Sequence, residues 1–473
     1  MALTRAPLRA YGVRLSAATR SRTGQLPWTT VNRSFAGSFH GSSSSTLRRG
    51  TAVRSLFPLT SAYTPSARLP LACSRRALAT VSQTSSSPSN DASSSDPTIT
   101  TDTLVIGAGP GGLTAVACML DNGAPSLTWI DPHFLGGRWG ERYGEVPSNT
   151  KVRLFLDFVR ASPFLSQLVA EAPRPNAHTH LAALPQDAGC PIREAADLVV
   201  FLSQQMLLRR ADRVRMLHGH VRGLQRHADA RWTARVRHAG AGGAATSAVS
   251  CARVVLATGS EPVTPADAPA GRALDLDTAL TPTALRRWID AAAPRALAVV
   301  GSSHSAVLAL KNITDVAPAL PVTHYFRHAP RYAEEMPGWI LHDNTGLKGV
   351  AADWARQTYP RLARINKVQL PGDEAAEAAL YRRERQGAGA AHDAVYAVGF
   401  RAAAAPEVRV DGEPAPRRAL AYDDRSGRFD VPGLFGCGIA YPERVTDPRG
   451  NVEHAVGMWK FMKYVKRVSG GWV

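Results

Sequence analysis

Residues 103–131 hold the sequence pattern that most restricts the fold of this chain. An apolar run at 103–106 has the length of a buried parallel strand. The turn Gly107-Ala108-Gly109-Pro110-Gly111-Gly112 follows it directly, and apolar residues then recur at helical spacing over 111–121. A second apolar run at 127–130 ends in Asp131. This order predicts a β-α-β unit of a doubly wound α/β fold.

Each residue of this turn has a physical role in binding a dinucleotide. Gly107 permits a tight turn, Gly109 lets the backbone approach a pyrophosphate, and Gly112 lets the helix pack close to the strand. Pro110 suits the first turn of the helix, whose N-terminus attracts phosphate. Asp131 lies 24 residues after Gly107 and is suited to accept hydrogen bonds from a ribose diol.

A second copy of this pattern begins about 190 residues later. The buried run 296–300 precedes Gly301-Ser302-Ser303-His304-Ser305-Ala306, and a helix is expected from about 304 to 312. Ser303 and Ser305 are small enough for close approach, so we predict a second nucleotide site that includes Gly301, Ser303 and Ser305. We expect His304 to face solvent or phosphate and not to act as a catalytic base.

The strand that follows, 322–326, ends in arginine and not in an acid. An acid at this position favours the 2′-hydroxyl of NAD, whereas arginine offers a bidentate contact to the 2′-phosphate of NADP. Arg327 and Arg331 therefore favour NADPH as the electron donor, with NADH as the alternative. A third possibility is that these arginines lie in a solvated basic loop that binds no nucleotide.

The segment after Asp131 resembles one class of known flavoproteins. Gly136-Gly137-Arg138-Trp139, Tyr143, Asn149-Thr150 and residues 155–158 are similar to the pattern of the flavin-containing monooxygenases, within the flavoproteins with two dinucleotide-binding domains. The resemblance implies FAD at the first site, with Trp139 packed beside it. It also places Asn149 next to the flavin, where an amide can donate to and accept from bound oxygen. The alternative is that Asn149 only caps the local turn.

Later segments extend the resemblance over roughly residues 101–470. Residues 192–209 are expected to form a helix, and 214–224, 231–237 and 247–256 to form strands, with a turn at 240–243 between the last two. In the flavoprotein group that this chain resembles, these strands lie around the adenine of FAD. Val221 matches the residue whose backbone contacts the adenine ring. The segment Ala257-Thr258-Gly259 matches the exit from the FAD domain.

The C-terminal part resembles the return of the chain into the FAD domain. Residues 394–400 are similar to the returning glycine turn, and Gly438 and Ile439 to the segment beside the ribityl chain. A helix over 451–467 would bring Val452 and Glu453 to the flavin edge. Residues 261–290 contain no histidine, which weakens assignment to the Baeyer–Villiger subfamilies.

These patterns predict two Rossmann-like doubly wound domains, with the NADP domain inserted in the FAD domain. The expected division is a disordered transit peptide and linker at 1–98, a first FAD segment at 99–262, the NAD(P) domain with a substrate-side insertion at 263–390, and the returning FAD segment at 391–473.

The net charge of +18 is concentrated at the N-terminus. The first 90 residues hold twelve arginines and no lysine or acid, which leaves about +6 on the remainder. A basic, hydroxylated, acid-poor segment is typical of a mitochondrial transit peptide, so we expect import into the matrix; a disordered basic tail is the alternative. Because no basic stripe stands out elsewhere, nucleic acid is not expected as a partner.

The five cysteines are widely spaced and contain no CxxC or CxxxxC pair. A disulfide reductase of the usual kind would therefore lack its dithiol, and no metal site is expected. No apolar run of about 18 residues predicts a membrane span. The expected partner is a small molecule, and a homodimer is left open.

Three hypotheses for function follow. The first is an FAD-dependent, NADPH-linked oxidoreductase of monooxygenase type, with Asn149 as its candidate catalytic residue. The second is a flavin reductase that acts on a quinone, a sulfur compound or a small disulfide. The third is a non-catalytic flavoprotein module.

Overall fold

The computed structural model describes residues 98–240, 245–265, 272–373, 376–377 and 393–473. The predicted transit peptide and linker lie outside these residues except for Thr98, and so do residues 241–243 of the expected glycine turn.

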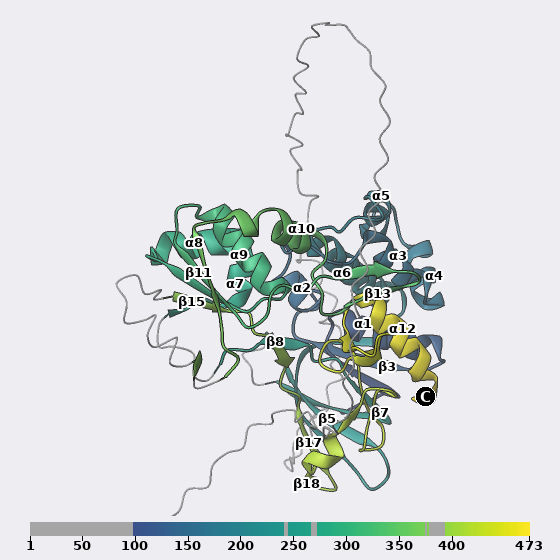
Figure 1. Ribbon diagram of the computed structural model, residues 1–473. Helices are drawn as coiled ribbons and strands as arrows, with labels where there is room; N and C mark the ends of the chain where they lie inside the picture. Colours follow the sequence, from purple (N-terminus) through teal and green to yellow (C-terminus); the bar gives the residue numbers. More distant parts are fainter. Residues whose placement is uncertain (1–97, 241–244, 266–271, 374–375, 378–392) are drawn as a thin grey trace, which may run out of the picture. The chain divides into compact units, whose positions relative to one another are not determined.

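The first sheet contains a parallel core that carries the first glycine turn (Figure 1). Its strands, in spatial order, are β4 (Val214–Arg226), β3 (Leu127–Asp131), β2 (Thr103–Ile106), β7 (Arg253–Leu256) and β21 (Leu434–Gly436). All four residues of β2 are buried, as expected for a strand with neighbours on both edges and packing on both faces. The predicted β-α-β unit is therefore present.

Strand β4 continues beyond this core into a mixed layer of the same sheet. The further strands are β5 (Trp232–His238), β6 (Thr246–Cys251), β1 (Thr98–Thr100), β17 (Glu407–Val410) and β18 (Glu413–Pro414), with β20 (Arg428–Phe429) and β19 (Tyr422–Asp423) at the other edge. In this layer β4, β5 and β6 pair antiparallel, while β1 and β17 pair in parallel with β6 and β4. Alternate residues of β5, among them Trp232, Ala234 and Val236, are buried in one apolar cluster, as a half-buried antiparallel strand requires.

The prediction of a single strand over 247–256 is wrong, because two separate strands, β6 and β7, lie on either side of Ala252 and pair with different strands. Strand β6 pairs antiparallel with β5, whereas β7 pairs parallel with β2. The carbonyl of Asp102 accepts hydrogen bonds from the amides of Ala252 and Arg253 at this bend, and the Arg253 side chain pairs with the Asp102 carboxylate at 2.5 Å.

Helices cover the parallel core and supply its largest apolar cluster. They are α1 (Pro110–Asp121), α2 (Arg138–Glu141), α3 (Val152–Arg160), α4 (Pro163–Glu171), α5 (Ala177–Ala183), α6 (Ile192–Arg209) and α12 (Met458–Val468). Helices α1 and α12 contact each other (Figure 1), and Leu113, Met119 and Met462 are fully buried members of the apolar cluster. The prediction of a helix over 192–209 is confirmed.

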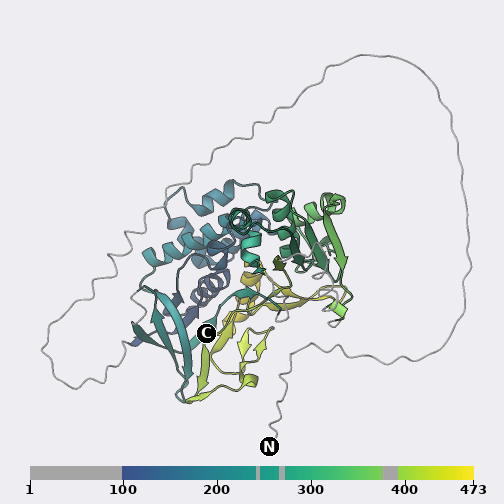
Figure 2. The same ribbon diagram turned by 90° about the vertical axis from the view of Figure 1, so that its left-hand side faces the viewer.

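A second, fully parallel sheet carries the second glycine turn (Figure 2). Its strands, in spatial order, are β14 (Ile365–Gln369), β11 (Val322–Phe326), β10 (Leu297–Val300), β15 (Asp393–Tyr396) and β9 (Arg272–Ala273). The helices of this unit are α7 (Leu276–Leu280), α8 (Pro282–Ala292), α9 (His304–Val316) and α10 (Gly349–Gln357), with a 3-10 turn at Tyr359–Arg361. A mixed sheet with a parallel core, a second parallel sheet and the helices packed on them confirm the predicted α/β fold class.

The two sheets are connected by a two-stranded ribbon, in which β8 (Ser260–Pro262) pairs antiparallel with β16 (Phe400–Ala402). The division expected at residue 390 falls just before β15, yet β15 is hydrogen-bonded within the second sheet. The chain therefore leaves that sheet only after Tyr396. A small hairpin of β12 (Glu334–Met336) and β13 (Trp339–Leu341) lies in the insertion before α10.

The helix expected over 451–467 is wrong in its first part. Residues Val452–Ala455 form β23, which pairs with β22 (Glu443–Thr446), and α12 begins only at Met458. The turn between the two strands is held by Asp447, whose carboxylate accepts from the amides of Arg449 and Asn451. A turn of this composition favours a hairpin over a helix start.

Among the described residues, no helix combines the length and the apolar character needed to cross a membrane.

Candidate functional site

The first glycine turn is held by close backbone contacts. Gly107 has a φ of +104°, and a Cβ there would lie 2.3 Å from the carbonyl oxygen of Ala257. A Cβ on Gly112 would lie 1.8 Å from the carbonyl oxygen of Gly107. Both positions therefore require glycine for packing, as predicted, and the contacts bring the turn against the end of β7.

Gly109 differs from its neighbours because the space beside it is open. A Cβ on Gly109 would find its nearest atoms, in Gly136 and Gly137, 3.9 Å away. Gly438 lines the same helix start, because a Cβ on Gly111 would lie 2.8 Å from the Cα of Gly438. Backbone from three segments thus surrounds the N-terminus of α1 without side chains, which is the form of a phosphate-binding cradle.

Helix α1 begins at Pro110, directly after its N-cap Gly109. Proline suits this position because the first amides of a helix have no partner within the helix, and proline has no amide hydrogen to leave unpaired. The remaining amides of the first turn carry the positive end of the helix dipole. The electrostatics of the cradle therefore favour an anion.

Asp131 ends β3 beside this cradle and is buried. Its carboxylate accepts backbone hydrogen bonds at 2.8 Å each from Ala108, His133 and Phe134. A carboxylate has about four acceptor positions, so one is left for a ribose hydroxyl. Asp131 therefore shapes the turn as well as offering the contact that the sequence predicts.

Trp139 and Asn149 occupy different environments. Trp139 is half-buried in α2, and its ring meets that of Phe155 edge to face at 6.2 Å. Asn149 is exposed, and the turn beside it is held instead by Ser148, whose hydroxyl accepts from the amide of Thr150 at 2.9 Å. The Asn149 Oδ1 also accepts a long hydrogen bond from the hydroxyl of Thr150, at 3.5 Å, and the side chain is otherwise exposed.

The residues expected around the adenine and at the domain exit lie on or directly after two strands of the first sheet, β4 and β7, which are separated by β3 and β2. Val221 is half-buried in β4, where it pairs with Val236 next to a bulge. Ala257 and Thr258 directly follow β7, and Gly259 has a φ of +79° with no atom near its would-be Cβ.

The C-terminal predictions are partly corrected. Ile439 follows the glycine that contacts α1 and is 39% exposed, so it faces away from the core. Val452 was expected at a helix N-terminus, but it lies in β23 and is 49% exposed. The helix start is formed by Gly457, with a φ of +140°, and Met458. Neither Val452 nor Glu453, which also lies in β23, is at a helix start.

The second glycine turn repeats the geometry of the first. Gly301 has a φ of +125°, and a Cβ there would lie 2.3 Å from the carbonyl oxygen of Ala397. Ser303 is the N-cap of α9 and is exposed, and Ser305 is half-buried in its first turn. Small residues thus surround this helix start, as predicted.

His304 is half-buried and bonded within the protein, so it does not simply face solvent. Its Nε2 accepts a hydrogen bond from the backbone amide of Lys348 at 2.9 Å. Burial, with the nearby charge of Lys348, lowers the pKa of His304 to about 4. The ring is therefore neutral near pH 7 and ties the start of α9 to the start of α10.

The two arginines expected to read the 2′-phosphate follow β11. Arg327 forms a bidentate pair with Glu377, with N–O distances of 2.7 and 2.8 Å. Arg331 is exposed, and its backbone carbonyl accepts from the amide of Leu347. The guanidinium predicted to bind phosphate thus already contacts a carboxylate.

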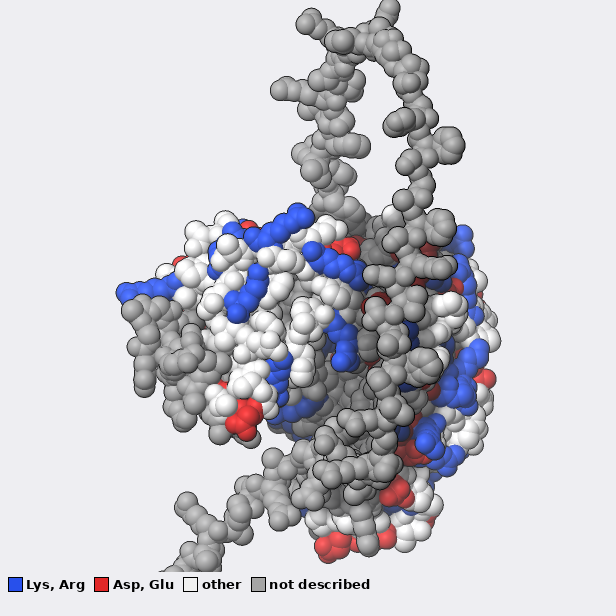
Figure 3. Space-filling model, in the orientation of Figure 1, with Lys and Arg blue, Asp and Glu red and all other residues white. Residues whose placement is uncertain are grey.

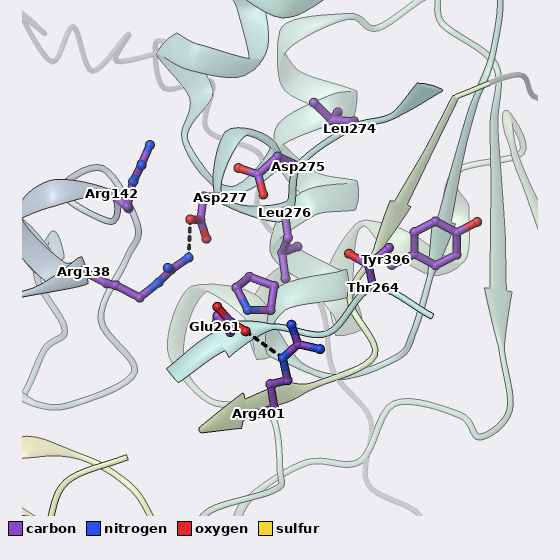
Figure 4. Close-up of a pocket in the computed structure, with 11 residues that line it drawn as sticks. Arg138, Arg142, Glu261, Thr264, Leu274, Asp275, Leu276, Asp277, Tyr396 and Arg401 are labelled. Atoms are coloured by element: carbon purple, nitrogen blue, oxygen red, sulfur yellow. Dashed lines mark hydrogen bonds and ion pairs between the residues drawn. The ribbon is translucent and has the colours of Figure 1, made fainter. Parts of the chain in front are cut away.

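A cavity of about 330 Å³ lies where the unit built on the first sheet meets the unit built on the second sheet (Figure 4). Its wall includes Arg138 of α2, Asp277 of α7, Tyr396 of β15, and the pair formed by Glu261 of β8 and Arg401 of β16 at 2.7 Å. The volume lies in the range of small-molecule sites, and the lining is largely polar and charged. None of the sequence-predicted site residues lines this cavity.

Asp277 links the two units at the edge of this cavity. It is buried, pairs with the guanidinium of Arg138, and accepts a hydrogen bond from the hydroxyl of Tyr143 at 2.7 Å. Burial and the hydrogen bond to Asp277 raise the pKa of Tyr143, so its phenol stays protonated and donates. The sequence does not predict the roles of Asp277 and Glu377, because each pairs with an arginine far away in the chain.

The cysteines in the described residues are poorly suited to redox chemistry. Cys118, Cys190, Cys251 and Cys437 are all free and buried. Burial raises the pKa of Cys190 to about 11 and that of Cys437 to about 12. Since the thiolate is the reactive form, these thiols are weak nucleophiles at neutral pH.

Two Rossmann-like units and an open glycine cradle at a helix start are the features of dinucleotide-binding proteins. The chain belongs to the family of monooxygenase AgnR1 from Paecilomyces divaricatus. The two are 40% identical over 399 residues, which cover 78% of this chain and 97% of the relative. This relative confirms the predicted similarity to monooxygenases. No protein-family model matches the chain.

Solved structures show more distant similarity. The reduced form of ornithine hydroxylase (PvdA) from Pseudomonas aeruginosa aligns over 79% of this chain and 97% of its own, with 14% identity and a TM-score of 0.49. Bacillithiol disulfide reductase Bdr (YpdA) from Staphylococcus aureus aligns over 79% and 98%, with 10% identity and a TM-score of 0.46.

Proposed function

We propose that this protein is an FAD-dependent, NADPH-linked monooxygenase that acts on a small molecule. The observation that carries the proposal is the relative, a monooxygenase that matches the chain over 97% of its own length. Two helix starts lined by small residues, one for each nucleotide, support it.

The residues present fit FAD at the first turn. The backbone around Gly109 and Gly137 offers an open cradle for the pyrophosphate, and Asp131 keeps one acceptor position for the ribose. The amides at Gly457 and Met458 begin α12 and would stabilise negative charge on a bound ring system. Bound FAD would supply the redox chemistry, taking a hydride from the nicotinamide and activating oxygen.

The chain's own contribution to the reaction would be binding and hydrogen bonding. Asn149 is exposed and keeps an amide that can donate and accept at once. We assign it the stabilisation of oxygen close to the flavin. The second turn would hold NADPH through the start of α9, with Arg327 and Arg331 near the 2′-phosphate, and NADH is the alternative donor.

Anaerobic mixing of the purified protein with NADPH or NADH tests the first half of this proposal. The absorbance of an oxidised flavin should bleach rapidly, and faster with NADPH than with NADH. A protein that purifies without flavin, or whose flavin bleaches with neither nucleotide, would contradict the proposal.

Admitting oxygen to the reduced protein separates a monooxygenase from a reductase. A monooxygenase should show a short-lived absorbing species before the oxidised spectrum returns, and Asn149→Ala should shorten its lifetime and increase hydrogen peroxide release. If oxidation is slow and shows no such species, but a quinone or small disulfide reoxidises the flavin rapidly, the reductase alternative is correct.

A further inference from the structure

The hydrogen bonds of the two glycine turns show which residues correspond in the two units. The amide of Gly107 donates to the carbonyl of Ile130, and the amide of Gly301 donates to the carbonyl of Tyr325. Asp131, directly after Ile130, thus has Phe326 as its counterpart. Arg327 follows one residue later, at the carboxyl edge of the sheet where the ribose of a bound nucleotide would lie.

Glu377 is brought to the same edge by a short helical turn. Strand β14 neighbours β11 and ends at Gln369. Asp373 then accepts hydrogen bonds from the amides of Ala376 (through its carboxylate) and Glu377 (through its backbone carbonyl). This turn directs the Glu377 side chain back to Arg327, although the two residues are 50 apart in sequence.

The pair is asymmetric in its exposure to solvent. The carboxylate side chain of Glu377 is 9% exposed, whereas the side chain of Arg327 is 59% exposed. Hydrogen bonds from Arg327 outweigh burial and lower the pKa of Glu377. The exposed guanidinium of Arg327 is thus held by Glu377 through at least two of its N–H groups, and this carboxylate offsets its charge.

We propose that Glu377 is a specificity-determining residue, which competes with the 2′-phosphate of a nicotinamide nucleotide for Arg327. This inference rests on the proposed function, because it requires a nicotinamide nucleotide at the second turn. A 2′-phosphate gains less from Arg327 while Glu377 holds the guanidinium, and it is repelled by the carboxylate. A 2′-hydroxyl has no comparable charge and is affected little. The Arg327–Glu377 pair thus lowers the affinity for NADPH relative to the affinity for NADH.

Binding of two nucleotide fragments tests this inference on the full chain without chemistry. Calorimetry with adenosine 2′,5′-bisphosphate should give a Kd about 3- to 10-fold lower for Glu377→Gln than for the unchanged protein, since one repelling charge is removed. The Kd for adenosine 5′-monophosphate should change less than about twofold. The gain should shrink as salt is raised, because salt screens exposed charges.

Two controls separate the local effect from a change in net charge. Glu407→Gln removes a carboxylate that pairs with Arg409 at 2.9 Å in the other sheet, and it should leave both Kd values unchanged. In an Arg327→Gln background, Glu377→Gln should give a clearly smaller gain for the bisphosphate, because it removes only the repulsion and releases no guanidinium.

The outcomes distinguish this inference from the proposed function. Unchanged or weaker binding of the bisphosphate by Glu377→Gln, or a full gain without Arg327, would overturn the role of Glu377 alone. If neither fragment binds the unchanged protein or the variant, the nucleotide site fails, and the NADPH-linked function fails with it.

Discussion

The ammonium group of Lys460 lies 2.8 Å from a carboxylate oxygen of Asp343. Lys460 belongs to the first turn of α12, whereas Asp343 lies in the loop 342–348 of the second unit, and Lys348 pairs with the other oxygen of Asp343. The same loop reaches α9, because the amide of Lys348 donates to His304. One short loop thus contacts both the start of α9 and the start of α12.

Replacing Asp343 with Asn should destabilise the fold strongly. Burial lowers the pKa of Lys460, and Asp343 opposes this effect by stabilising the charged form. Without the carboxylate, two neighbouring lysines lose their shared counterion, which we expect to cost about 2–4 kcal/mol of unfolding free energy. Urea unfolding at pH 7 measures this cost.

Asp315→Asn provides a matched control, because Asp315 pairs with Lys311 at 2.6 Å on the exposed surface of α9. Its expected cost is below about 0.5 kcal/mol. The pKa of Asp343 is lowered because its two lysines outweigh burial, so its contribution is present above about pH 4 and is lost as the pH falls through the folded-state pKa. Equal costs for both variants would show that the loop is not held by Asp343.

His304 should make stability depend on pH between about 4 and 6.5. Burial holds its pKa in the folded protein at about 4, whereas an unfolded histidine titrates near 6.5. The unfolded state therefore binds the extra proton in this window, and stability falls as the pH is lowered, by up to about 2–3 kcal/mol.

The variant His304→Gln keeps an acceptor for the Lys348 amide but does not titrate. Its unfolding free energy should fall less than that of the unchanged protein between pH 6.5 and 4.5. His324, which is also buried with a lowered pKa, contributes equally to both proteins and cancels in the difference. Parallel curves for the two proteins would contradict the buried, neutral state of His304.

The sequence reveals the β-α-β units well because their signals are local. The glycines at 107 and 112 follow a buried strand directly, and their roles depend on atoms a few residues away or on the adjacent strand. Asp277 and Glu377 could not be found in this way. Their arginine partners are 139 and 50 residues distant, and only the fold brings them together.

Two predictions from the sequence, the helix start at 451 and the single strand over 247–256, are wrong for different reasons. The turn around Asp447 contained a usable signal, an Asp-Pro-Arg-Gly-Asn run that favours a hairpin, and it would have corrected Val452. The break at Ala252 left no such signal, because β6 and β7 differ in their partner strands and not in their intrinsic strand preference.

Asp277 and Tyr143 should contribute unequally to the contact between the two units. Asp277→Asn leaves the partly buried Arg138 without its counterion, so we expect a loss of about 2–3 kcal/mol in unfolding free energy. Tyr143→Phe removes only the 2.7 Å hydrogen bond to Asp277, which contributes about 1 kcal/mol. Thermal and urea unfolding of both variants check this order, and a larger loss for Tyr143→Phe would contradict it.

We propose that residues 1–98, nearly all outside the described residues, direct the protein to mitochondria. Their twelve arginines and lack of acids before Asp91 favour electrophoretic import. A fluorescent protein fused after residue 98 should accumulate in the matrix of yeast or fungal cells. The same fusion with its arginines changed to glutamine should stay outside, and an unaltered fusion that remains cytosolic would refute the proposal.

Gly109 and Gly112 should separate cofactor binding from folding. A methyl group at Gly112 would begin 1.8 Å from the Gly107 carbonyl, so Gly112→Ala should lower the unfolding free energy by more than about 2 kcal/mol, even without cofactor. The methyl group of Gly109→Ala would meet no atom within 3.9 Å and fills only the cradle. This variant should therefore fold normally but purify with little flavin, which the ratio of flavin to protein absorbance measures. If Gly109→Ala keeps a full complement of FAD, the pyrophosphate does not lie against this turn, and the assignment of the first site is wrong.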